Sequence, residues 1–183
     1  LGRILTVVVW LLAMTPLSAH SNSRAELDAQ LEATVARHLG IFVTLPTQRD
    51  PAEHIALEGT TLSLGFLRPL AKGLSTDICD GGRWLLVGRL EQTRGALSLF
   101  KSATKVQRIR LQFVDVRTTV HPSAKGVYEQ HRTVIPQITF EISRERALKL
   151  DPKVLRRTLK GQRCSSLVRS LLDKVSVEIG GAR

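Results

Sequence analysis

The sequence predicts an α+β fold, with an N-terminal helix, a central antiparallel sheet, and C-terminal helices packed on that sheet. Three patterns indicate this class: an apolar stripe of helical period near the start, alternating apolar and polar residues in the middle, and a return to helical period after residue 150. Strands and helices gathered into separate runs are typical of α+β domains, whereas doubly wound folds alternate them regularly.

The first predicted helix spans 23–39. Ser23 and Glu26 have the spacing of a capping box, and Gly40 follows as a helix stop. His38 lies in the last turn, where a cation would suit the helix dipole. The apolar residues recur at every fourth position and define one buried face: Leu27, Leu31, Val35 and Leu39.

Strands are predicted wherever apolar and polar residues alternate. One such pattern begins at Thr60, and the clearest covers 105–120, where Ile109, Leu111 and Phe113 alternate with polar residues. We expect a turn at 121–126. The following run, 127–142, would then complete a long hairpin that Pro136 interrupts.

The segments between these strands are harder to assign. Residues 69–82 contain glycine, proline and aspartate and predict a turn-rich stretch, including a turn at 77–82. The dense apolar run 84–90 predicts another strand. The apolar piece 96–100 is too short to assign to either class.

Helical period returns near the C-terminus. Asp151 and Pro152 predict an N-cap followed by proline in the first turn. Gly161 is expected to end this helix. A second helix is expected from Ser165 or Ser166, with a short strand after it near 177–179. The apolar face of the first of these helices is expected to contain Val154, Leu155, Thr158 and Leu159.

Composition excludes several classes of protein. The chain has 183 residues, of which 43% are hydrophobic, so it is neither intrinsically disordered nor a multi-span membrane protein. The net charge is +11, from 27 Lys and Arg against 16 Asp and Glu. We therefore expect a basic protein with one core.

The first 21 residues predict a secretory signal peptide. Arg3 precedes an apolar run that ends at Met14, and small residues follow it up to Ala19. A charged start, a short apolar run and a small-residue exit are typical of such leaders. We expect cleavage after Ala19 or Ser21, which leaves 22–183 as a single periplasmic or extracellular domain without a transmembrane span. The alternatives are an uncleaved anchor and a buried core segment.

Two cysteines, Cys79 and Cys164, lie in the predicted mature chain. In an exported protein such a pair is most simply a disulfide. A catalytic thiol at Cys79 is the alternative, although it would need a neighbouring base. Neither cysteine belongs to a CxxC pair, so no structural zinc site is predicted.

Positive charge concentrates between residues 144 and 163, where eight Lys or Arg accompany two acids. We predict an anion-binding face there, with an anionic lipid, a polysaccharide or another polyanion as its partner. Nucleic acid is not expected, because no aromatic residues interleave the charges. A merely solvated helix face is the alternative interpretation. The face comprises Lys153, Arg156, Arg157 and Lys160, which Arg108 and Arg110 on the central strand would extend if they point the same way.

The other candidate chemistry is a histidine pair. His121 and His131 flank the predicted hairpin turn and could approach each other across it, with Asp115 as a third group. No HExxH unit, GxSxG elbow, Walker loop or GxGxxG motif occurs, so the sequence predicts no metal site and no cofactor.

The function predicted from these features is that of an exported, non-catalytic binding or structural component of the cell envelope or extracellular space. One alternative is a small secreted enzyme of hydrolase type that uses Cys79 or the pair of His121 and His131. Another alternative is an interaction subunit of an envelope complex. The oligomeric state does not follow from the sequence.

Overall fold

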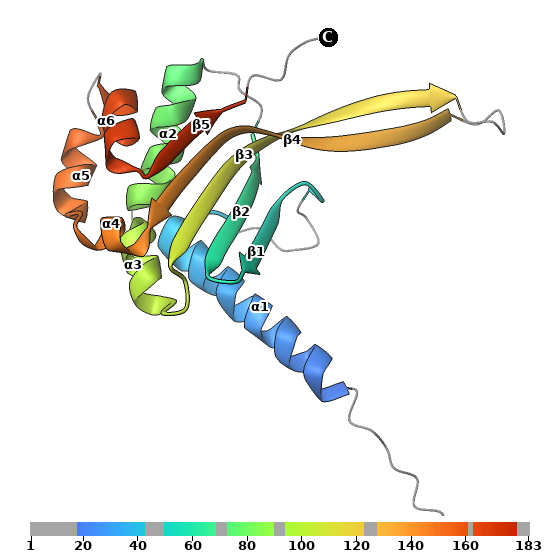
Figure 1. Ribbon diagram of the computed structural model, residues 1–183, viewed down its shortest axis with the longest axis horizontal. Helices are drawn as coiled ribbons and strands as arrows, with labels where there is room; N and C mark the ends of the chain where they lie inside the picture. The colour runs from blue at the N-terminus through green and yellow to red at the C-terminus, as the bar shows by residue number, and fades with distance from the viewer. Residues whose placement is uncertain are drawn as a thin grey trace, which may run out of the picture.

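The computed structural model describes residues 18–42, 50–68, 73–89, 94–122, 128–160 and 163–178. Figure 1 shows five strands in one sheet, with helices gathered against it. In chain order the elements are α1 (Ser18–Leu39), β1 (His54–Glu58), β2 (Thr61–Leu67), α2 (Leu74–Val87), α3 (Gly95–Ser102), β3 (Arg108–Pro122), β4 (Tyr128–Ser143), α4 (Arg144–Leu148), α5 (Pro152–Thr158), α6 (Cys164–Leu171) and β5 (Lys174–Val177).

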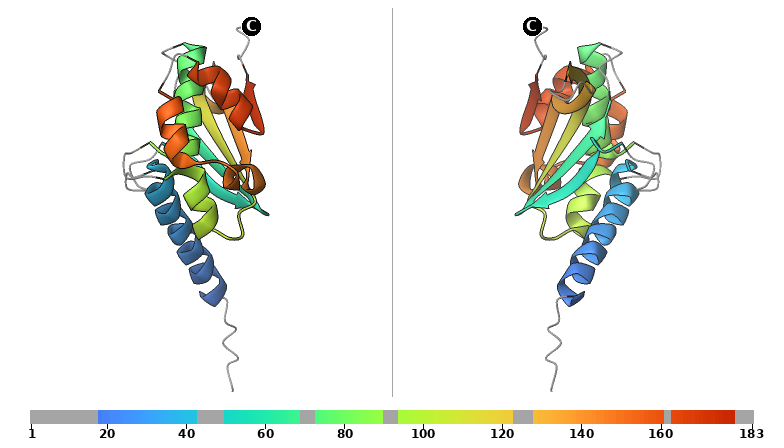
Figure 2. Two further views of the ribbon diagram at one scale, coloured as in Figure 1. Left: turned by 90° about the vertical axis from the view of Figure 1, so that its left-hand side faces the viewer. Right: turned by 90° about the vertical axis from the view of Figure 1, so that its right-hand side faces the viewer.

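The strands lie in their chain order, β1-β2-β3-β4-β5, and α2, α5 and α6 lie on one side of the sheet (Figure 2). This arrangement confirms the α+β class. The prediction of an antiparallel sheet is wrong for one pair of strands. Strands β2 and β3 run parallel, while the other three neighbouring pairs are antiparallel. The reason is the connection: α2 and α3 stand between β2 and β3 and carry the chain back to the same end.

The alternating pattern of the central strands places their apolar residues beneath the helices. Ile109, Leu111 and Phe113 are fully buried, and so is Phe140 on the neighbouring strand. Edge-to-face contacts connect Phe113 to Phe140 at 5.4 Å and to Trp84 of α2 at 5.2 Å. The predicted period-two burial of this region is confirmed.

The main error of the sequence interpretation concerns α2. The predicted turn at 77–82 and the predicted strand at 84–90 are both wrong, because Leu74–Val87 forms one continuous helix. The two glycines inside it serve close packing. A Cβ at Gly81 would lie 2.3 Å from Phe140 Cζ, and one at Gly82 would lie 2.2 Å from Val168 Cγ1. The unassigned piece 96–100 is also helical, in α3.

Helix α1 begins at Ser18, so the predicted capping box at Ser23 is wrong and that residue lies inside the helix. Residues 1–17, most of the predicted leader, lie outside the described residues, and its last four form the first turn of α1. None of the helices described is long and apolar enough to cross a membrane. Burial, together with Arg37 and Arg94, lowers the pKa of His38, so the expected cation at this helix end is disfavoured.

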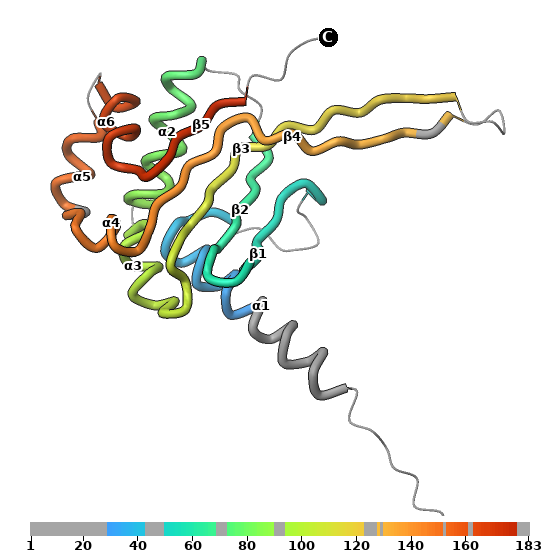
Figure 3. The backbone as a smooth tube through the Cα atoms, viewed as in Figure 1, coloured from blue at the N-terminus to red at the C-terminus, as the bar shows by residue number. Residues whose placement is uncertain are grey.

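Strands β3 and β4 form the predicted long hairpin, and it reaches well beyond the rest of the sheet (Figures 1 and 3). Pro136 does not end β4. It faces Val114 at a register shift, where the hairpin leaves the sheet. The predicted turn falls largely outside the described residues, which stop at Pro122 and resume at Tyr128. We call the part built from 115–122 and 128–135 the arm.

The predicted cap of α5 is confirmed, because the side chain of Asp151 accepts a hydrogen bond from the backbone N–H of Lys153. Its predicted apolar face holds in part. Leu155 and Leu159 are buried, but Val154 is 54% exposed. The helix is also shorter than expected, since it ends at Thr158.

Candidate anion-binding site

A disulfide between Cys79 and Cys164 ties α2 to α6, with their Cα atoms 5.4 Å apart. The predicted pairing is therefore confirmed, although Cys79 lies in a helix and not in a turn. Because its sulfur is bonded, Cys79 holds no thiol for the nucleophile that the sequence left open.

A hollow of about 280 Å³ opens between the C-terminal end of α2 and the helix α5. Both walls of the hollow contain residues that are close in sequence to the disulfide. On one wall Arg83 follows Cys79 by one helical turn, and on the other Lys160 precedes Cys164 by four residues. The residues that line this hollow are Arg83, Val87, Gly88, Arg89, Arg156, Leu159 and Lys160.

Among the residues that the structure describes, the lining of this hollow contains four cationic side chains and no carboxylate. Two of the cations are held in place. Arg156 Nη2 donates to the carbonyl oxygen of Val87 at 3.1 Å, and the Arg89 guanidinium lies 4.8 Å from the centre of the Trp84 ring. Within the part of the chain that the structure describes, no ion pair neutralises Arg83, Arg89 or Lys160.

Part of this positive charge is balanced by the helix end. The last carbonyl groups of α2 carry a partial negative charge, which favours nearby cations. That partial charge is equivalent to roughly half an elementary charge. The hollow therefore keeps a large positive excess, and an anion placed in it would be attracted by all four side chains.

The six residues predicted to bind an anion do not lie together in the structure. Arg156 and Lys160 line the hollow, whereas Lys153 and Arg157 of the same segment are exposed and do not. Lys160 lines the hollow from just beyond the end of α5, since the helix ends at Thr158.

Arg108 and Arg110 lie elsewhere. They point away from the helices, because their neighbour Ile109 is the residue buried beneath them. Both are bound to Glu141, at 3.2 Å from Arg108 Nη1 and 2.9 Å from Arg110 Nε. They therefore cannot extend the basic face.

Sequence reasoning missed Arg83 and Arg89. Both fall next to or inside a segment interpreted as a strand, so their positions relative to a helix face could not be seen. With 74–87 taken as a helix, Cys79, Arg83 and Val87 fall at four-residue intervals on one side. That spacing is the sequence signal that would have identified Arg83.

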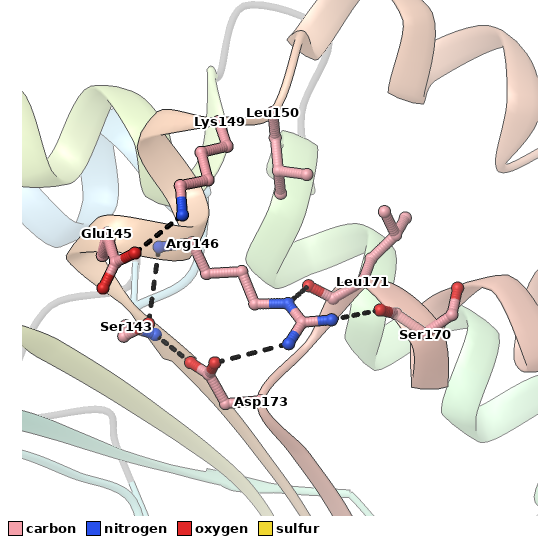
Figure 4. A pocket seen from close by; sticks show the side chains of 8 residues that line it. All are labelled: Ser143, Glu145, Arg146, Lys149, Leu150, Ser170, Leu171 and Asp173. Carbon is pink, nitrogen blue, oxygen red and sulfur yellow. Dashed lines mark hydrogen bonds and ion pairs between the residues drawn. The ribbon is translucent and has the colours of Figure 1, made fainter.

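A second hollow, of about 380 Å³, lies beside α4 and the end of α6 (Figure 4). The charged side chains described in its lining form ion pairs with one another. Lys149 Nζ binds Glu145 at 2.7 Å and thereby lowers the pKa of that carboxyl, while Arg146 pairs with Asp173. Arg146 also donates to the carbonyl oxygens of Ser170 and Leu171 at the end of α6. This cluster holds α4 against α6, and the charged residues described in its lining are paired with one another.

The histidine pair is formed as the sequence suggested, with the rings of His121 and His131 5.5 Å apart and both residues exposed. Asp115 does not join them. It lies six residues from His121 along the extended strand, a separation of roughly 20 Å. Among the residues described, no group of three His, Cys, Asp or Glu could hold a metal ion.

Comparison of the chain with family models, with curated proteins and with solved structures gives no match. The hollow between α2 and α5 is therefore the feature from which a function can be inferred.

Proposed function

We propose that this protein is an exported, non-catalytic binding protein that holds a phosphate-type oxyanion group in the hollow between α2 and α5. The observation that carries the proposal is the lining of that hollow, in which four cations converge on about 280 Å³ and no acidic residue occurs in the described part of the chain. Four like charges gathered in one place repel one another, and a bound anion would offset that repulsion.

The types of cation present suit an oxyanion with several oxygens. Guanidinium groups donate two parallel hydrogen bonds to phosphate-like groups, and three of the four cations are arginines. Because the Val87 carbonyl and the Trp84 ring already orient Arg156 and Arg89, binding would cost little side-chain entropy. The volume is just below the usual range for drug-sized ligands, which favours a head group or small anion.

The leader-like pattern of residues 1–21 and the disulfide support export to the periplasm or extracellular space. In such a compartment, phosphate-type groups occur on anionic lipids, on polysaccharides and as free ions. These sources share the chemistry that the hollow would recognise, so separate probes must distinguish them.

The test compares two double variants of equal charge change. Arg83→Gln with Lys160→Gln removes two charges from the hollow, and Lys153→Gln with Arg157→Gln removes two from the exposed side of the neighbouring helix. Binding of inorganic phosphate and of pyrophosphate is measured by calorimetry at low and high salt. Vesicles with and without phosphatidylglycerol report on the lipid source.

We expect the first double variant to weaken phosphate binding at least tenfold and the second less than twofold. Added salt should weaken binding to the unmodified protein. Equal effects of the two double variants would mean that only general basicity attracts the anion. Unchanged binding in the first variant, with the fold verified by circular dichroism, would refute the proposed site.

A further inference from the structure

The arm has one apolar and one polar face. The cross-strand pairs Val116 with Val134 and Pro122 with Tyr128 share a face with Val120. The polar residues on this face are Thr118, Gln130 and Arg132. Three of these side chains are strongly exposed: Val120 by 53%, Tyr128 by 74% and Val134 by 45%. The opposite face is polar and includes Arg117, Thr119, His121, His131 and Thr133, with Asp115 and Ile135 at its base.

The arm also has an unpaired edge. Strand β2 pairs with β3 only as far as Val114, so within the described residues 115–122 have β4 on one side and no strand on the other. A two-stranded ribbon is marginally stable by itself in water. This ribbon therefore combines two features that a partner would complete: a free backbone edge and an apolar face.

We propose that the free edge of β3 in the arm pairs antiparallel with the same edge of a second copy of this chain. The two arms then form one four-stranded sheet around a two-fold axis. Identical edges placed antiparallel are self-complementary by symmetry, which makes a second copy a suitable occupant. This inference is independent of the anion site.

The side-chain pattern selects one register. Opposite residues of antiparallel strands share a face, so the apolar faces of the two arms become continuous only if the two-fold axis passes through a residue. With the axis at Thr118, Val116 lies opposite the partner's Val120, and Asp115 lies opposite the partner's His121. An apolar pair and an acid–base pair thus form twice each.

Neighbouring registers are less favourable. An axis at Thr119 separates Asp115 from the partner's His121, and an axis at Arg117 places two arginines opposite each other. Like charges directly across a sheet are destabilising. On the outer edge of β4 the residue that faces Thr118 is Arg132, and an axis there would place two arginines opposite each other. Charge complementarity therefore favours the β3 edge centred on Thr118.

Cross-linking tests the register. All native cysteine is in the disulfide, so Thr118→Cys introduces a single thiol. Opposite residues of antiparallel strands have Cα atoms about 4.5–5.5 Å apart, within the range of a disulfide. Thr133→Cys is the control, because it lies on the outer strand of each arm, three strand spacings across and two residues along from its counterpart, or ~16 Å.

We expect mild oxidation to convert most of the Thr118→Cys protein, but little of the Thr133→Cys protein, into a covalent dimer. Equal cross-linking of both variants, or none of either, would overturn the proposal.

Light scattering after size-exclusion chromatography tests the interface without a cross-link. The unmodified full chain should be dimeric, and Val120→Glu should raise the dimer dissociation constant at least tenfold, because it places carboxylates on the joined apolar face. Thr119→Glu, one position along on the polar face and opposite the partner's Arg117, should leave that constant within about twofold. A monomer at all concentrations, or a dimer that Val120→Glu leaves intact, would refute the arm as the interface.

Discussion

At the residue scale, Arg68 links the sheet to α2 through both its charge and its contacts with aromatic rings. Its guanidinium lies 4.9 Å from the ring centres of both Trp84 and Phe113, and it binds Asp77 at 3.3 Å and Asp80 at 2.7 Å. Asp77 is completely buried, and its second carboxylate oxygen has no hydrogen-bond partner. Arg68 therefore compensates a carboxylate that would otherwise be buried alone.

Replacing Arg68 with methionine should lower the free energy of unfolding by about 3–5 kcal/mol at neutral pH, because it leaves the Asp77 carboxylate buried and without a counter-charge. Asp80→Asn is the milder control, since the Asp80 side chain is 27% exposed and water can replace the lost interaction. Urea denaturation followed by fluorescence measures both. A loss below about 1 kcal/mol for Arg68→Met would show that Asp77 is compensated in another way.

Helix α2 shows at the element scale how a local pattern can mislead. Asp77, Asp80 and the two following glycines have the composition of a turn, and this composition predicts a turn at 77–82. In the structure the glycines are the positions where α2 approaches Phe140 of the sheet and Val168 of α6. Tertiary packing overrides the local preference there, because only residues without a side chain permit that approach.

Gly81→Ala should destabilise the protein by about 1–3 kcal/mol, although alanine usually favours a helix over glycine by roughly 0.5–1 kcal/mol. The reason is the added methyl group, which would lie 2.3 Å from the buried Phe140 ring. Thr76→Ala on the exposed side of α2 is the control and should be neutral or slightly stabilising. Thermal and urea unfolding of both variants decide the sign, and a stabilised Gly81→Ala protein would contradict the packing argument.

The strands were easier to predict than this helix. Their period of two is visible in 105–120 and 137–142, because one face is buried under helices and the other is polar. The cap at Asp151 was equally clear, since capping depends on neighbours in sequence. The parallel pairing of β2 with β3 was not predictable, because it depends on two helices whose assignment was wrong or open.

The disulfide is the longest-range covalent constraint at the scale of the whole molecule. It joins residues 85 positions apart and connects α2 with the C-terminal helices, which also form the two walls of the basic hollow. A bridge over such a span restricts the unfolded chain strongly. It therefore contributes to global stability and to the alignment of the hollow.

Cys79→Ala with Cys164→Ala should lower the free energy of unfolding by about 4 kcal/mol, the chain-entropy value for a loop of this size. Chemical reduction of the unmodified protein should have the same effect in urea denaturation, which controls for packing changes at the two alanines. A loss below about 1 kcal/mol in both experiments would show that the bridge adds little to the fold.

The sequence by itself determined the α+β class, the pairing of its two cysteines and the basic character of the chain. Periodicity and composition are visible in the sequence, and two cysteines allow only one pairing. Only the tertiary structure decided which cations act together. It placed Arg83 and Arg89 beside Arg156 and Lys160 and neutralised Arg110 with Glu141. The physical reason is that the field at a site depends on charges brought close in space, and these come from residues about 30 to 80 positions apart in the chain.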